Sequence, residues 1–303
     1  AGECIIGADS HTCTYGALGA FSTGVGTTDI ATGMAMGELW FKVPSAIKFV
    51  LTGKPGKYVS GKDIIIHIIG KIGVDGALYK SMEFTGDGIK NLSMADRFTM
   101  ANMAIEAGAK CALFTPDEKT AEYCNIELND YQKSLVGDPD ATYMRTITYK
   151  AEDFVPVMAL PSQVDKIRNV SEVEGTEINQ VFIGSCTNGR LEDLQAAAEV
   201  LKGKKVADFV KLIVTPASRK IYKQAADMGI LTTLSEAGAI ITHPGCGLCC
   251  GRTGGILSDG ERVVATNNRN FLGRMGTSKV EIYLASPKTA AACAVAGKIV
   301  SPK

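Results

Sequence analysis

The sequence predicts an α/β fold, in which parallel or mixed sheets are flanked by helices. Short apolar runs of strand length alternate with amphipathic helical patterns, an order typical of parallel sheets covered by helices. Glycine accounts for 33 of the 303 residues, which exceeds the usual share of ~7%. Aromatic residues make up only 7% of the chain. A glycine surplus with few aromatic residues favours an α/β protein with many tight turns between strands and helices.

In the first half of the chain, each predicted element rests on an apolar pattern or a capping residue. The helix that opens at 60–63 has five isoleucines on one face, the last of them Ile72. Ser93 is a suitable N-cap for a helix that ends at Ala107, before Gly108. We expect strands at 4–7, 47–51, 82–84 and 109–114, and helices at 28–39, 60–72 and 93–107.

The second half alternates more regularly, and three domains are expected overall. Strands are expected at 181–184, 210–214, 239–242, 262–265 and 280–284, with helices at 191–201, 218–228 and 287–296. The apolar pattern weakens between residues 115 and 149, so we place a domain boundary near there. The expected domains are residues 1–41, the C-terminal remnant of a first α/β domain; 42–147, a second; and 148–303, a third that carries the cysteine motifs. A core strand at residue 4 suggests that the chain lacks its natural beginning.

Charge, hydropathy and cysteine usage argue against several functional classes. The 32 Lys and Arg residues balance the 32 Asp and Glu residues, whereas a nucleic-acid footprint needs a basic excess or stripe. No apolar run reaches the ~18 residues of a membrane span, so no membrane partner is expected. The nine cysteines are an odd number, and the first residues lack a basic segment followed by an apolar one. We therefore expect a reducing, cytoplasmic location.

Three cysteines occupy positions at which a metal or cluster could be held. Cys246 and Cys249 are three residues apart in a glycine-rich loop after a short strand, so both thiolates can turn toward one ion or cluster. Cys186 follows another strand and precedes a helix, which places it at the same edge of a parallel sheet. These three residues are the predicted metal ligands. The others are interpreted as buried small side chains: Cys4, Cys13, Cys111, Cys124, Cys250 and Cys293.

The thiols alone leave three interpretations open. A single C-x-x-C pair also occurs in structural zinc sites and in redox pairs. A closed zinc site needs four ligands, and the sequence has no second C-x-x-C pair and no neighbouring histidine pair. A thioredoxin-type pair should open a helix, whereas residues 251–255 resemble a loop. Three thiolates on an iron–sulfur cube would leave one iron with an open position, which can act as a Lewis acid on a hydroxyl or carboxylate.

Carboxylates and one histidine are candidates for acid–base chemistry. Asp9 and His11 directly follow the first predicted strand, and an acidic residue beside a histidine is suited to proton transfer. Glu83 stands at the end of another strand, before two glycines, and is a second candidate carboxylate. Its alternative interpretation is an ordinary solvated strand end.

A third group of polar residues follows the predicted strand at 262–265. It contains Asn268, Arg269 and Arg274. Two arginines five residues apart can clamp a carboxylate through paired hydrogen bonds. On their own, the two arginines would be interpreted as solvated surface residues.

Together, four motifs resemble those of the aconitase family and occur in the family's order along nearly the whole chain. They are Gly7-Ala8-Asp9-Ser10-His11-Thr12, Gly184-Ser185-Cys186-Thr187-Asn188, Gly245-Cys246-Gly247-Leu248-Cys249 and Asn268-Arg269-Asn270-Phe271-Leu272-Gly273-Arg274. Four ordered motifs over this length are highly specific, and they imply an aconitase-like fold of α/β/α domains. Segments 16–21 and 24–29 most resemble the branch of the family that acts in leucine biosynthesis.

The resemblance implies a hydro-lyase whose substrate is a small hydroxy diacid. The reaction would move a hydroxyl between adjacent carbons by dehydration and rehydration, through an unsaturated diacid. Cys186, Cys246 and Cys249 would hold a 4Fe-4S cluster, and the iron not ligated by protein would bind the substrate hydroxyl and a carboxylate.

The resemblance also implies roles for the polar residues. Asp9 and His11 would belong to the network that handles the leaving water, with His11 paired to Glu83. Asn268 would lie beside the cluster. Arg269 and Arg274 would hold a substrate carboxylate.

Two parts of the family's pattern have no counterpart in this sequence. One is an N-terminal segment with further catalytic histidines. The other is a swivelling domain with a serine base and further arginines, which in this branch is a separate small subunit. We therefore expect a small-subunit partner and no activity of the chain alone. The alternatives of similar chemistry are homoaconitase and a 2,3-dimethylmalate-type dehydratase; those of other classes are an RNA-binding regulator active without the cluster and a structural zinc protein.

Overall fold

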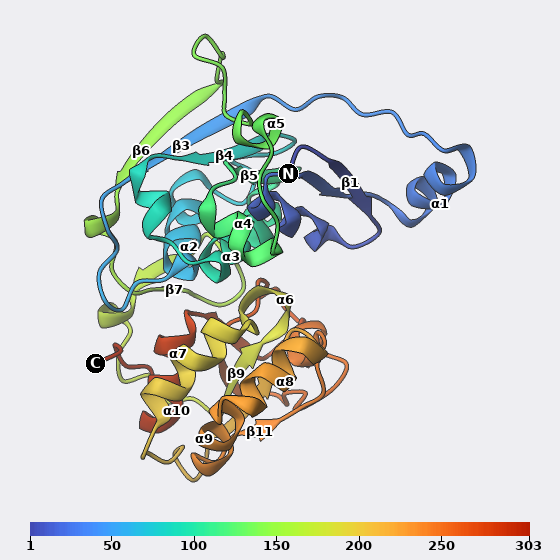
Figure 1. Cartoon of the computed structure of the whole chain (residues 1–303). Coiled ribbons are helices and arrows are strands. Elements are labelled where there is room, and N and C mark those ends of the chain that lie inside the picture. Colours follow the sequence, from blue (N-terminus) through green and yellow to red (C-terminus); the bar gives the residue numbers. More distant parts are fainter. The chain divides into compact units, whose positions relative to one another are not determined.

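The computed structural model describes residues 1–303, which form two compact units (Figure 1). Unit 1 comprises residues 1–56 and 72–153, and unit 2 comprises residues 57–71 and 154–303. Both units contain parallel strands accompanied by helices, which confirms the predicted fold class. None of the helices combines the length and the apolar character needed to cross a membrane.

The main sheet of unit 1 has four parallel strands in the order β5-β4-β3-β6. The strands are β3 (Ala46–Thr52), β4 (Ser81–Thr85), β5 (Cys111–Phe114) and β6 (Arg145–Lys150). Phe84, on the middle of three neighbouring strands, stacks on Phe49 and Phe114 with ring centroids 5.3 and 5.0 Å apart. Strand β6 was not expected from the sequence, because none of its side chains is fully buried and it lacks an apolar run.

A two-stranded parallel sheet pairs β1 (Cys4–Gly7) with β2 (Phe21–Gly24) and carries the first polar motif. The 3-10 helix η1 (Ser10–Leu18) joins these strands and packs so closely on β5 that a Cβ atom at Gly16 would overlap the carbonyl oxygen of Ala112. The other helical elements of unit 1 are α1 (Thr27–Met36), η2 (Asp87–Asn91), α3 (Met94–Met103), η3 (Ala104–Ala107), α4 (Glu118–Cys124), α5 (Asp130–Lys133) and η4 (Ala151–Asp153). Ser93 caps α3 as predicted, since its Oγ accepts the Asp96 N–H at 3.1 Å.

Unit 2 contains a seven-stranded mixed sheet in the order β11-β10-β9-β12-β13-β7-β8. The five strands from β11 to β13 are parallel, and β7 and β8 are antiparallel additions. The bounds are β7 (Val157–Ala159), β8 (Ile167–Asn169), β9 (Gln180–Gly184), β10 (Lys211–Thr215), β11 (Ile240–Ile241), β12 (Arg262–Ala265) and β13 (Glu281–Leu284). The carboxyl ends of β9 and β12 are neighbours, so the residues that follow them meet at one edge.

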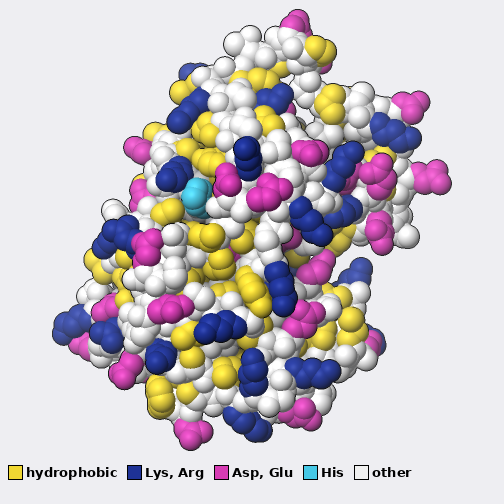
Figure 2. Space-filling model, turned by 90° about the vertical axis from the view of Figure 1, so that its left-hand side faces the viewer, with side chains coloured by type: hydrophobic (Ala, Val, Ile, Leu, Met, Phe, Trp, Pro, Cys, Tyr) yellow, Lys and Arg dark blue, Asp and Glu magenta, His cyan; other side chains and the backbone are white.

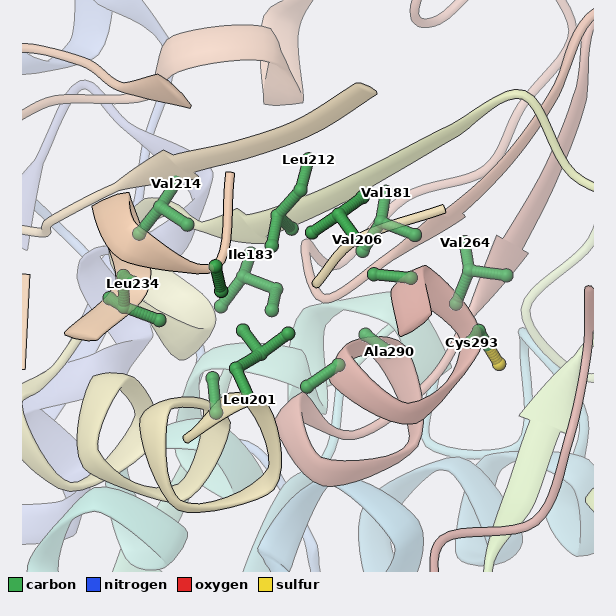
Figure 3. Packing of buried hydrophobic residues seen from close by; sticks show 14 of the residues in the cluster. Val181, Ile183, Leu201, Val206, Leu212, Val214, Leu234, Val264, Ala290 and Cys293 are labelled. Atoms are coloured by element: carbon green, nitrogen blue, oxygen red, sulfur yellow. The ribbon is translucent and has the colours of Figure 1, made fainter. Parts of the chain in front are cut away.

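The core of unit 2 lies between β9 and β10 on one side and a layer of helices on the other (Figure 3). Ile183 and Val214 point from the sheet toward Leu201 and Leu234, and all four side chains are buried. The helical elements are α2 (Gly61–Ile72), η5 (Val170–Glu172), α6 (Ser185–Asn188), α7 (Leu191–Leu201), α8 (Arg219–Asp227), α9 (Ile230–Glu236), η6 (Gly247–Cys250) and α10 (Pro287–Ala296). Helix α2 is almost entirely buried, and a Cβ atom at Gly70 would lie 2.5 Å from Ile167 of β8.

Candidate active site

Cys186 lies in a sharp turn at the carboxyl end of β9. Gly184 has a φ of 150° and Ser185 a φ of 71°, so a non-glycine residue adopts the left-handed region here. A Cβ atom at Gly184 would overlap the carbonyl oxygen of Thr215 on β10. The one-turn helix α6 then begins, and Cys186 in its first turn is partly exposed. Such backbone strain persists only where the surrounding packing enforces it, and it clusters at functional sites.

Cys246 and Cys249 belong to the turn that follows β11. The Cys249 N–H donates to the Cys246 carbonyl at 3.1 Å, and Cys249 is buried while Cys246 is exposed. Gly247, between them, has a φ of 53°, and a Cβ atom there would lie 2.5 Å from Thr215 Oγ1. The turn is therefore packed against the end of β10, the neighbour of β9. It is a 3-10 turn that ends in Gly251, and the pair does not open an α-helix.

The side chain of Asn268 lies between two of the predicted ligand thiols. It follows β12 and is fully buried. Its Oδ1 is 3.8 Å from Cys249 Sγ, and its Nδ2 is 4.0 Å from Cys186 Sγ. Nδ2 also donates to Thr187 Oγ1 at 2.8 Å. One amide thus contacts both cysteine turns at the carboxyl edge of the sheet.

Two cationic side chains accompany the buried thiol of Cys249. Arg274 Nη2 is 3.9 Å from Cys249 Sγ, and the Nε of this arginine is buried with no hydrogen-bond partner. Lys62, on α2, is fully buried; burial lowers its pKa from 10.5 to about 7, against the opposing charges of Asp193 and Cys249. Arg269 is partly buried, and its carbonyl accepts the Asn267 amide at 2.8 Å.

The predicted ligand thiols are not gathered around a single point. No three Cys, His, Asp or Glu side chains lie close enough together in this structure to hold one metal ion. Cys249 instead directs its thiol toward the Asn268 amide, and Cys246 faces solvent. Metal ligands are commonly drawn together only when the metal binds, because binding and ordering of the site are coupled.

In unit 1, His11 lies between two carboxylates. Its Nε2 is 3.3 Å from Glu106 Oε1, and its Nδ1 is 3.4 Å from Asp9 Oδ1. Asp9 also caps η1, because its Oδ1 accepts the His11 N–H at 2.7 Å. The His11 and Glu106 side chains are only 10% and 4% exposed. A histidine with an acceptor at each ring nitrogen can hold a proton on either side and pass it on.

The expected pairing of His11 with Glu83 was wrong. Both carboxylate oxygens of Glu83 accept the Tyr143 hydroxyl, at 2.8 and 2.9 Å. Burial, followed by the hydrogen bond to Glu83, raises the pKa of Tyr143 to about 12. Glu83 lines a cavity of about 370 Å³ in unit 1, and neither His11 nor Glu106 belongs to its walls. Sequence order alone could not distinguish two glutamates that both stand near strand or helix ends.

Sequence reasoning also missed Glu106 and its neighbour Asn102. Asn102 Nδ2 donates to Thr14 Oγ1 at 3.0 Å, and Thr14 Oγ1 donates to the His11 carbonyl at 2.6 Å. Glu106 was detectable in principle, because it is the one charged residue within the small and apolar run 100–109. A charge in such a run is buried only when it has a partner.

Several curated relatives match the whole chain. The 3-isopropylmalate dehydratase large subunit of Acetivibrio thermocellus is 60% identical over 301 residues, which cover 99% of this chain and 72% of that protein. The corresponding large subunits of Clostridium kluyveri and Clostridium botulinum (strain Alaska E43) are 59% and 57% identical over 302 and 303 residues. Each of these two matches covers 100% of this chain and 72% of the relative.

A solved structure and a family profile agree with these relatives. The crystal structure of Thermococcus kodakaraensis aconitase X in its holo-form superimposes with a TM-score of 0.52 and 14% identity, over 91% of this chain and 64% of that one. This likeness concerns the fold. The sequence profile of the aconitase family (aconitate hydratase) matches residues 1–297. The chain belongs to the aconitase family.

Proposed function

We propose that the chain is the large subunit of a 3-isopropylmalate dehydratase. This hydro-lyase interconverts 2-isopropylmalate and 3-isopropylmalate by dehydration and rehydration. The observation that carries the proposal is the identity of 55–60% to curated large subunits of that enzyme along the whole chain. Homoaconitase and a 2,3-dimethylmalate-type dehydratase share this chemistry. The substrate test below distinguishes these two alternatives from a 3-isopropylmalate dehydratase.

Cys186, Cys246 and Cys249 would hold a 4Fe-4S cluster at the carboxyl edge of the unit 2 sheet. The residues present fit an anionic cluster bound through thiolates. The Asn268 amide and the Arg274 guanidinium, with its unused Nε, lie beside the buried Cys249 thiol and can donate hydrogen bonds toward an anionic cluster. When bound, the cluster would supply a Lewis acid for the substrate hydroxyl at its iron without a protein ligand.

Arg269 and Arg274 are assigned to the carboxylates of the substrate. Arg274 is the better supported of the two, because its buried Nε has no protein partner. A guanidinium can bind a carboxylate through two parallel hydrogen bonds, and the Nε of Arg274 is available for one of them. Asn268 would keep its side chain against Cys186 and Cys249 beside the bound cluster.

We assign to His11 the transfer of the proton with which the substrate hydroxyl leaves as water. Its Nε2 faces Glu106 and its Nδ1 faces Asp9, so one nitrogen can carry the proton while the carboxylate at the other nitrogen orients the ring. Proton transfer by a positioned side chain contributes typically about 10²–10⁴-fold to a rate. Glu106 takes the place that the sequence analysis gave to Glu83.

A small subunit that carries the swivelling domain is the proposed partner, and the proposed location is the cytoplasm. The relatives are large subunits by name, which is the basis for expecting a small one. Figure 2 shows Lys and Arg side chains interspersed with Asp and Glu over the visible face. This face therefore lacks the continuous basic surface that nucleic-acid binding needs.

The test uses the complete large subunit that contains this sequence, reconstituted anaerobically and supplied with the small subunit. We expect bound iron and acid-labile sulfide, and turnover of 2-isopropylmalate in preference to homoaconitate and 2,3-dimethylmalate. Cys186→Ser, Cys246→Ser and Cys249→Ser should each lose the cluster. Cys250→Ser is the matched control, because Cys250 lies in the same turn and bonds only the Gly247 carbonyl, at 3.5 Å. Binding of one zinc without sulfide would refute the proposal, and turnover of another malate alone would correct the substrate.

A further inference from the structure

Lys62 is a fully buried lysine that the proposed chemistry does not use. It lies in the first turn of α2, and its Nζ donates to the carbonyls of Thr266 and Asn267 at 2.6 and 2.5 Å. Its hydrogen bonds go to carbonyl oxygens and not to a carboxylate. The first turn of a helix is the positive end of the helix dipole, where a cation is disfavoured. The Lys62 ammonium is therefore disfavoured both by its burial and by the helix dipole. A charge in such a place needs a partner of opposite charge nearby.

The backbone that Lys62 holds is the segment that connects the two cysteine turns. Thr266 Oγ1 accepts the N–H of Gly184 at 3.0 Å, just before the strained turn that leads to Cys186. Two residues further along, the Asn268 side chain contacts the thiols of Cys186 and Cys249. A lysine that fixes the carbonyls of residues 266 and 267 therefore fixes the direction in which the next side chain leaves the backbone.

The charge of Lys62 also acts on the thiols. The groups that act electrostatically on its ammonium are Asp193, Cys249, Asp63 and Cys186, so two of the four are predicted cluster ligands. The two carboxylates are already engaged: Asp193 accepts the Asn188 amide and the Arg190 N–H, both at 3.0 Å, and Asp63 accepts the Ser60 and Val157 N–H groups at 2.9 and 3.2 Å. A bound cluster would add further negative charge beside this ammonium.

We propose that Lys62 is a positioning residue of the cluster site. It holds the Thr266–Asn267 carbonyls so that the Asn268 side chain stays between Cys186 and Cys249. Its charge also raises the reduction potential of a cluster bound there. This inference rests on the proposed function, since it needs the cluster. Net charge, hydrogen bonds and burial set the potential of iron–sulfur clusters. Groups that act behind the ligands typically change metal affinity by about 10–100-fold when they are removed.

The experiment compares the reconstituted complete large subunit with three variants. Lys62→Met removes the charge and both hydrogen bonds, whereas Lys62→Gln removes the charge but keeps an N–H donor. Lys71→Met is the matched control, because Lys71 is exposed in the last turn of the same helix. The readouts are iron and sulfide content, the rate of cluster loss in air, the midpoint potential by a redox titration followed by electron paramagnetic resonance, and thermal unfolding of the cluster-free protein.

We expect Lys71→Met to match the unaltered protein in every readout. Lys62→Met should lose about tenfold in cluster affinity, and both Lys62 variants should shift the midpoint potential to more negative values. Lys62→Gln should retain more cluster than Lys62→Met. A merely structural lysine would lower thermal stability and leave the potential of the remaining cluster unchanged.

Three outcomes would overturn the inference. One is an unchanged potential in a folded Lys62→Gln protein that still binds cluster. Another is equal cluster retention in Lys62→Met and the unaltered protein. The third is failure of both Lys62 variants to fold while Lys71→Met folds, which would assign Lys62 to the fold alone. Absence of iron and sulfide from the unaltered protein would instead refute the proposed function itself, so the two failures are distinguishable.

Discussion

Replacement of Asp117 is expected to destabilise unit 1, because it leaves a buried arginine without its counter-ion. The guanidinium of Arg97 is fully buried and donates two hydrogen bonds to Asp117, at 2.8 and 2.6 Å. Removal of one partner of a buried ion pair costs about 3–5 kcal/mol. The Asp117 side chain is 18% exposed, so we take the lower end, about 3 kcal/mol, for Asp117→Asn.

Asp117→Ala should be more destabilising than Asp117→Asn. Asp117 is also the N-cap of α4, where its Oδ1 accepts the Thr120 N–H at 3.2 Å. Loss of an N-cap side chain costs about 1 kcal/mol, and asparagine caps almost as well as aspartate. The alanine variant should therefore lose about 1 kcal/mol more than the asparagine variant.

The contribution of this ion pair should depend on pH in one direction. Burial raises the pKa of Asp117, but the hydrogen bonds and charge of Arg97 outweigh it and hold the pKa below the usual 3.8. A carboxyl whose folded pKa is depressed stabilises the protein fully above its unfolded pKa, and this stabilisation is lost as the pH falls through the folded pKa. The difference between the original protein and Asp117→Asn should therefore be constant at neutral pH and shrink below 3.8.

The assay is native-state hydrogen exchange resolved to peptides, because a chain of two units need not unfold in one step. Peptides of α3 and α4 should lose protection, while those of unit 2 keep it. Asp227→Ala is the control: it breaks the exposed pair with Lys223, 2.7 Å apart, and should cost less than about 0.5 kcal/mol. A cost for Asp117→Asn as small as that of the control would refute the argument, because it would mean that water reaches the Arg97 charge.

Three further substitutions or modifications test other parts of the structure. Gly16→Ala should destabilise unit 1 by about 1–3 kcal/mol, because the new methyl group overlaps the backbone of β5, whereas Gly56→Ala meets nothing within 4 Å; equal exchange protection in both variants would contradict this. Thr266→Val removes the buried acceptor of the Gly184 N–H and should cost unit 2 about 1–3 kcal/mol in urea unfolding; a neutral result would show that the N–H finds another acceptor. Burial raises the pKa of Cys111 to about 12, so iodoacetamide at about pH 8 should modify the exposed Cys246 in the cluster-free protein and leave Cys111 unmodified by mass spectrometry; comparable labelling of both would disprove the assigned burial.

The sequence predicted those elements best whose local pattern and caps agree with the tertiary structure. The helices at 191–201 and 287–296 and the strand at 262–265 have the predicted bounds. Each combines a clear apolar pattern with a boundary signal or a neighbouring turn. Strands β2, β6, β7 and β8 were missed, since a short Ser- and Thr-containing run, an exposed edge strand and two strands of three residues carry little periodicity.

The placement of the cysteine turns at one edge of the unit 2 sheet was predictable from topology. The side-chain contacts of His11 were not. Residues that follow parallel strands meet at the carboxyl edge of their sheet, so Cys186 and the Cys246–Cys249 turn were expected at one edge from the strand pattern, whereas Asn268 was placed there only by the family resemblance. Glu106 stands 95 residues from His11 in the chain, and its contact depends on how η1 packs on η3, which directly follows α3. No local pattern specifies such packing, and Glu83 was therefore chosen in its place.

The placement of α2 has a consequence for how this protein can be made and cut. The helix belongs to unit 2, yet in the chain it stands between two parts of unit 1, so the polypeptide passes from one unit to the other at residues 56, 71 and 153. During synthesis, its isoleucines emerge well before the strands that will bury them. A fragment that begins at Phe154 would lack this helix and its lysine, so the cysteine-bearing half of the molecule is not a contiguous piece that truncation could release intact.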